Sequence, residues 1–132
     1  MKYFITFSLL FFTFSSYSQT QLEQNSSAFD KFKLADKNLN ITYNKVIKMY
    51  SSDTLFIKNL RVSQRLWIKF RDAEMDMKYP EYGGAHYGSI QSFCDAEYKT
   101  KLTKERTKRL YEWVKGVEDG SICSGSTRNN GL

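Results

Sequence analysis

Five polar residues lie on otherwise apolar faces of the chain and are the first candidates for chemistry. They comprise a carboxylate, two amides and two guanidinium groups: Asp36, Asn40, Gln64, Arg71 and Arg106. Each lies three or four positions from an apolar residue, so a helix would place it on the inner face. Catalysis by Asp36 as acid or base would call for a second carboxylate or a histidine, which the pattern does not supply. We therefore predict a structural polar network between helices, with an arginine fork contacting Asp36, and no enzyme.

A glycine-rich segment offers a different kind of site. Residues 82–88 read Y-G-G-A-H-Y-G, which places the aromatic and titratable side chains of Tyr82, His86 and Tyr87 close together. Glycines permit a close backbone approach, and aromatic residues are common anchors in interfaces. The glycine spacing does not match a nucleotide-binding fingerprint. Two interpretations remain open: a partner-binding loop, or a plain connection whose tyrosines pack on the protein.

The two cysteines, Cys94 and Cys123, raise the question of a disulfide. An even cysteine count in an exported chain favours one bridge. A helix over residues 94–115 would span about 32 Å, and the eight residues that follow reach about 27 Å when extended. Free thiols and a bridge formed after local unwinding both stay open. With one histidine beside these two cysteines, we expect no metal site, and no cofactor is predicted.

The N-terminus has the organisation of a secretory signal peptide, predicted for residues 1–18. Lys2 supplies the positive charge, and an uncharged apolar run of 12 residues follows, which is too short to cross a bilayer. Ser16 and Ser18 place small residues before a cleavage that would leave Gln19 first. We therefore expect an exported protein, periplasmic or secreted, without a transmembrane segment.

The positioning elements should be helices, because the chain has one proline and seven glycines. We predict an all-α fold, a small three-helix antiparallel bundle that follows the signal peptide. The expected organisation is a polar lead-in, a helical domain and a flexible C-terminal tail: residues 19–26, 27–116 and 117–132. Within the domain, the helices are expected at about residues 27–50, 54–79 and 89–116.

Local signals support these boundaries. Asp53 follows two serines and should cap the second helix, while Pro80 should end it. Leu60, Trp67 and Met75 recur at helical spacing and should form the inner stripe of that helix.

Four short motifs, in order, resemble those of the lysozyme inhibitor LprI-like N-terminal domain family. They are D-x-x-L-N-x-x-Y, Q-x-x-W-x-x-F-R-D-A, G-S-I-Q and L-T-x-x-R-T, at residues 36–43, 64–73, 88–91 and 102–107. The resemblance implies a small exported helical domain found in bacterial envelopes. It also implies lysozyme inhibition as the inherited activity.

The chain departs from the family at three positions. Members commonly carry cysteines where this sequence has Ser27, Met75 and Tyr98. Their joint loss is expected if some of them normally pair. In that case, Met75 and Tyr98 would pack apolar surface in place of a bridge.

Charge separates the two functional hypotheses. The net charge is +6, or +5 once Lys2 leaves with the leader, and the expected third helix is rich in lysine. The first hypothesis is a binding protein that occludes the cleft of lysozyme or a related peptidoglycan-cleaving enzyme. The second is an envelope interaction or scaffold protein that binds an anionic polymer or lipid surface through the basic helix, without inhibition. The positive charge would slow the encounter with a basic lysozyme, and nucleic acid is not an expected partner of an exported protein.

Overall fold

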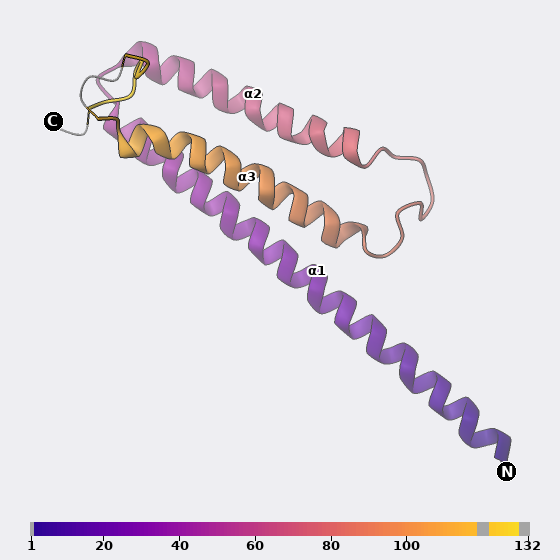
Figure 1. Cartoon of the computed structure of the whole chain (residues 1–132). Helices are drawn as coiled ribbons and strands as arrows, with labels where there is room; N and C mark the ends of the chain where they lie inside the picture. Colours follow the sequence, from indigo (N-terminus) through magenta and orange to yellow (C-terminus); the bar gives the residue numbers. More distant parts are fainter. Residues whose placement is uncertain (1, 119–121, 130–132) are drawn as a thin grey trace.

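Within the residues that the structure describes, the protein folds into three helices. The computed structural model describes the backbone of residues 2–118 and 122–129, and the side chains from residue 20 onward within those ranges. The helices are α1 (Lys2–Met49), α2 (Thr54–Lys78) and α3 (Gln91–Lys115). α1 and α3 run in the same direction and α2 runs opposite to both (Figure 1). The predicted all-α, three-helix architecture is confirmed.

The ends of α2 and α3 follow local sequence signals. The Asp53 carboxylate accepts a hydrogen bond of 2.9 Å from the backbone N–H of Phe56, which is the predicted N-cap. α2 ends at Lys78, two residues before Pro80, and α3 ends at Lys115, where the C-cap residue Gly116 has a φ of 76°.

α1 begins much earlier than residue 27. Its helix includes residues 19–26, and in Figure 1 it continues well past the N-terminal end of α3. The lead-in contains neither proline nor glycine, so nothing in it interrupts a helix that is nucleated further along the chain. The side chains of residues 1–19 lie outside the described part, and the signal peptide remains a prediction.

The core lies mainly between α1 and α3. Small and apolar residues recur on the two facing stripes, and α1 packs along α3 far more extensively than α2 does. The buried residues of these stripes are Ala28, Ala35, Leu39 and Val46 on α1, and Ala96, Thr100, Thr103 and Leu110 on α3. Alanine and threonine let the two helix backbones approach closely.

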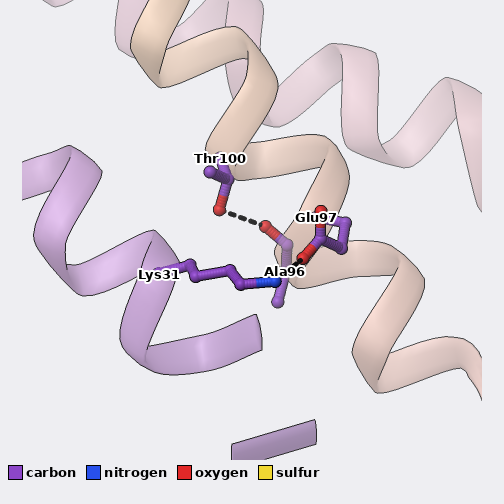
Figure 2. Close-up of polar contacts among 4 residues, drawn as sticks. All are labelled: Lys31, Ala96, Glu97 and Thr100. Carbon is purple, nitrogen blue, oxygen red and sulfur yellow. Dashed lines mark hydrogen bonds and ion pairs between the residues drawn. The ribbon is translucent and has the colours of Figure 1, made fainter. Parts of the chain in front are cut away.

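Polar contacts reinforce the same interface near the start of α3. The Lys31 ammonium lies 3.2 Å from the Glu97 carboxylate, and this ion pair, marked by a dashed line in Figure 2, links α1 to α3. One turn away, the Thr100 hydroxyl donates to the Ala96 carbonyl oxygen at 2.7 Å, so this buried polar group is satisfied within its own helix.

α2 packs less extensively. Leu60 and Met75 are buried and Trp67 is half-buried, so the predicted inner stripe is confirmed. Most other apolar side chains of α2 remain exposed.

The C-terminal segment returns to the helices. The Tyr50 hydroxyl accepts a hydrogen bond of 2.9 Å from the backbone N–H of Arg128, whose guanidinium lies 4.4 Å from the Tyr50 ring centre. The Trp113 indole N–H donates to the Ser126 hydroxyl at 3.0 Å. Residues 122–129 therefore find polar partners among the core aromatic side chains, and the flexibility of the C-terminal tail remains a prediction. Residues 119–121 and 130–132 lie outside the described part.

Cys94 and Cys123 are both free thiols, with Cys94 half-buried and Cys123 exposed. Within the part of the chain that the structure describes, no helix combines the length and apolar character needed to cross a membrane.

Candidate functional site

The loop between α2 and α3 gathers the three aromatic side chains selected from the sequence. The Tyr82 ring lies 4.9 Å from the His86 ring and 6.2 Å from the Tyr87 ring. His86 and Tyr87 meet edge to face at 4.8 Å, and Tyr87 in turn contacts Tyr79 at 5.6 Å in the same geometry. These four rings form a continuous group, which we call the aromatic loop cluster.

Two glycines allow the chain to turn within this cluster. Gly83 and Gly84 have φ values of 81° and 61°, where a side chain would be strained. The turn leaves Tyr82 67% exposed and forms an open depression of about 260 Å³ beside it. The loop is tied to α1 at its far end, where the Ser89 hydroxyl donates to the Gln21 side-chain oxygen at 3.3 Å.

Two tyrosines of this cluster, Tyr79 and Tyr87, remain neutral hydrogen-bond donors. Desolvation, with a smaller effect of Tyr82, raises the pKa of Tyr87 above 10.0. Desolvation, followed by the charges of Cys94 and Asp95, raises the pKa of Tyr79 in the same direction. An exposed group of rings and hydroxyl donors can therefore stack on sugar or aromatic surfaces and donate to carboxylates.

The five polar residues predicted to form one network make separate contacts, of which one set joins two helices. Arg106 on α3 donates from Nε to the Gln64 side-chain oxygen and from Nη2 to the Ser63 hydroxyl, both at 3.0 Å. Its guanidinium carbon also lies 6.0 Å from the Trp67 ring centre. Desolvation, with help from Arg109, lowers the pKa of Arg106. This contact is the interhelical part of the polar set.

The predicted contact between an arginine guanidinium and Asp36 does not form among the described side chains. Arg71 contacts its neighbour Asp72 at 2.7 Å, and the Asp36 carboxylate accepts from the Asn40 amide at 3.0 Å within α1. Asp36 and Arg71 do not meet because α1 packs against α3 and makes few contacts with α2. Ser63 was missed from the sequence, although it precedes Gln64 on the same helix.

Met75 and Tyr98 occupy the contact between α2 and α3. Met75 is buried, and the Tyr98 hydroxyl donates to the Glu74 carboxylate at 2.9 Å. This hydrogen bond is the main cause that raises the pKa of Tyr98. The Lys78 ammonium lies 3.8 Å from the centre of the Tyr98 ring, adding a cation–π contact.

A basic stripe runs along the outer side of α3. Lys101, Lys104, Lys108 and Lys115 recur at helical spacing and are all exposed. Within the described residues, none of the four forms an ion pair, whereas Arg109 lies 3.8 Å from Glu112. The sequence shows the lysines, and their spacing is the signal that places them on one side.

An apolar groove of about 390 Å³ lies between α2 and α3, near the C-terminal segment. Leu55, Phe56, Leu60 and Leu110 supply its apolar lining, and Arg106 adds a charged group. No sequence pattern indicates this groove, because a gap between helices depends on how far they diverge.

These features define a small all-α domain. No group of three or more histidine, cysteine or acidic side chains suited to a metal ion occurs in the part of the chain that was described. The model of the family described as lysozyme inhibitor LprI matches residues 14–110, and the chain belongs to this family.

The chain is also similar to an uncharacterized protein, R02472, of Rhizobium meliloti (strain 1021). The two are 29% identical over 112 residues, which cover 76% of this chain and 78% of that protein. No solved structure matches.

Proposed function

We propose that this protein is exported and inhibits lysozyme or a related peptidoglycan-cleaving enzyme by inserting the aromatic loop cluster into the enzyme's cleft. The family assignment supports inhibition, since the matching model covers the loop as well as α2 and most of α3. The observation that carries the choice of site is the exposure of Tyr82 and His86 beside Tyr87 on a turn held by α1.

The chemistry of the loop fits such a cleft. Glycosidases of this type act through a pair of carboxyl groups at the bottom of a groove that binds sugar rings. The hydroxyl groups of Tyr82 and Tyr87 and the imidazole of His86 can donate to those carboxylates, and the rings can occupy the sugar positions. Ring contacts within the cluster reduce the entropy lost on binding.

The test is a peptidoglycan-clearing assay in which the purified protein is titrated against a panel of lysozymes and bacterial autolysins. Saturable inhibition of at least one enzyme is expected. Replacing Tyr82, His86 and Tyr87 together by alanine should raise the inhibition constant about 100-fold or more, as expected for loss of interface anchors. Tyr111→Ala is the matched control, since this tyrosine is exposed on α3. Equal inhibition by the triple variant and the control would remove the loop from the mechanism.

The basic stripe on α3 supports a second candidate function. Four exposed lysines on one side of α3, which form no ion pair with the side chains that the structure describes, suit an anionic polymer or lipid surface of the envelope. Such binding should weaken steeply as salt is raised. Binding to anionic vesicles that is lost in Lys104→Gln/Lys108→Gln, without any enzyme inhibition, would favour this function over the first.

A further inference from the structure

α2 carries a second apolar stripe besides the one that packs on α3. Its members are large side chains between 40% and 66% exposed: Leu55, Val62, Leu66, Phe70 and Met77. At 100° per residue, this stripe lies roughly 130° around the helix axis from the inner stripe of Leu60, Trp67 and Met75. A helix at the surface of a monomer normally has one apolar stripe, so the second one indicates another partner.

The spacing of this stripe is symmetric about Leu66. Val62 and Phe70 lie four residues before and after it, and Leu55 and Met77 lie eleven residues before and after it. In an antiparallel pair of identical helices related by a two-fold axis, each residue meets the one at equal distance on the other side of the centre. The stripe is therefore complementary to itself when α2 is reversed.

The charges of α2 favour the same direction. Its N-terminal half contains Lys58, Arg61 and Arg65 and no acid, whereas all three of its acids, Asp72, Glu74 and Asp76, lie in the C-terminal half. The acids share that half with Lys69, Arg71 and Lys78. An antiparallel pair places the basic half of one helix beside the half of the other that contains the acids, whereas a parallel pair places the two basic halves together. Arg65 and Lys69, near the centre, are exposed and can extend their charged ends to solvent.

We propose that the protein forms a two-fold symmetric dimer in which α2 packs antiparallel against α2 of a second copy, with Leu66 at the axis. The groove between α2 and α3 adds to this fit, because Leu55 belongs both to its lining and to the exposed stripe. The pairing brings Met77 of the second copy beside Leu55, at the edge of this groove. Methionine is unbranched and flexible, so it can fill an irregular gap.

The first test is sedimentation velocity of the purified protein from micromolar to submillimolar concentration. Reductant is present throughout, because the exposed thiol of Cys123 could otherwise join two copies covalently. We expect a concentration-dependent dimer. Leu66→Lys should convert it to a monomer of unchanged helicity, because two ammonium groups would face each other at the axis. Leu34→Lys is the matched control: Leu34 on α1 has the same 59% exposure as Leu66, and its substitution should leave the dimer intact.

A charge exchange tests the direction of the pair. Lys58 and Asp76 are exposed at opposite ends of α2, so they lie near each other across the antiparallel interface. Lys58→Glu should raise the dissociation constant of the dimer about tenfold, which corresponds to roughly 1.4 kcal/mol. The double variant Lys58→Glu/Asp76→Lys should restore the wild-type dissociation constant. A wild-type protein that is monomeric throughout the concentration range, or a dimer unaffected by Leu66→Lys, would overturn the proposal.

Discussion

The contact between α1 and α3 differs in kind from the contact between α2 and α3. The first is built from small and apolar residues, among which Ala28, Val46 and Thr103 are 0% exposed. The second contains the buried residues Leu60 and Met75, but it also contains Arg106 with its polar partners and an open groove.

This difference indicates that the α1–α3 contact stabilises the fold, whereas α2 and the loop after it supply exposed surface. Close packing along α1 and α3 provides most of the apolar burial, and such burial is the main source of stability. α2 is held by fewer contacts and displays apolar surface together with the loop that follows it. The region that makes fewer internal contacts is thus the one that offers surface for partners, and the following substitutions test this division.

Shortening a core leucine should have the largest effect and should distinguish the two contacts. Leu39 on α1 is 2% exposed, and Leu39→Ala is expected to cost about 2–5 kcal/mol of unfolding free energy. Leu60→Ala on α2 should cost less, because Leu60 borders a groove where water can enter. Urea denaturation of both variants measures the difference. Equal losses would mean that the two contacts are equally tight.

Enlarging a small residue tests the close approach of α1 and α3. Ala35 is 2% exposed, so Ala35→Leu should force the helices apart and cost about 1–3 kcal/mol. Lys37→Leu serves as the control, because Lys37 is exposed on the same helix. Urea denaturation measures both variants. An Ala35→Leu variant as stable as the wild type would show that the α1–α3 interface can accommodate a larger side chain.

Polar contacts that join two helices should contribute more to the free energy of unfolding than polar contacts within one helix. Arg106→Ala removes two hydrogen bonds between α3 and α2 and should cost about 1–2 kcal/mol. Asp36→Ala removes a contact within α1 and should cost about 0.2–0.5 kcal/mol. A loss of several kcal/mol for Asp36→Ala would indicate a buried charge pair instead.

The smallest expected effect is a pH dependence at the α2–α3 contact. The hydrogen bond to Glu74 raises the pKa of Tyr98 above 10.0 in the folded protein. The contact therefore stabilises the fold fully below pH 10 and is lost as the pH rises through the folded pKa. Tyr98→Phe should lose less stability than the wild type between about pH 9 and pH 11, whereas Tyr111→Phe should follow the wild type. Identical profiles for Tyr98→Phe and the wild type would contradict this assignment.

Sequence reasoning succeeded where the signal was local. The N-cap at Asp53, the end of α2 before Pro80 and the inner stripe of Leu60, Trp67 and Met75 each depend on a few neighbouring residues. The aromatic residues of the loop could also be selected from the sequence, but their mutual ring contacts depend on the turn at Gly83 and Gly84.

Features that depend on distant contacts were not accessible in the same way. Periodicity indicates that Asp36 and Arg71 lie on inner faces, but it does not say which helix each face meets. Packing of α1 on α3 then separates these two residues. The contact of Arg128 with Tyr50 spans 78 residues, and nothing near Arg128 in the sequence indicates it.

The most direct test of the proposed inhibitory loop is hydrogen exchange of the protein, alone and saturated with an enzyme that it inhibits. Without the enzyme, amides of α1 and α3 in the core should exchange more slowly than those of α2. With the enzyme, we expect new protection at residues 79–90, around the aromatic loop cluster, and none along the lysines of α3. Protection along α3 with an unchanged loop would contradict the account and transfer the binding site to the basic stripe.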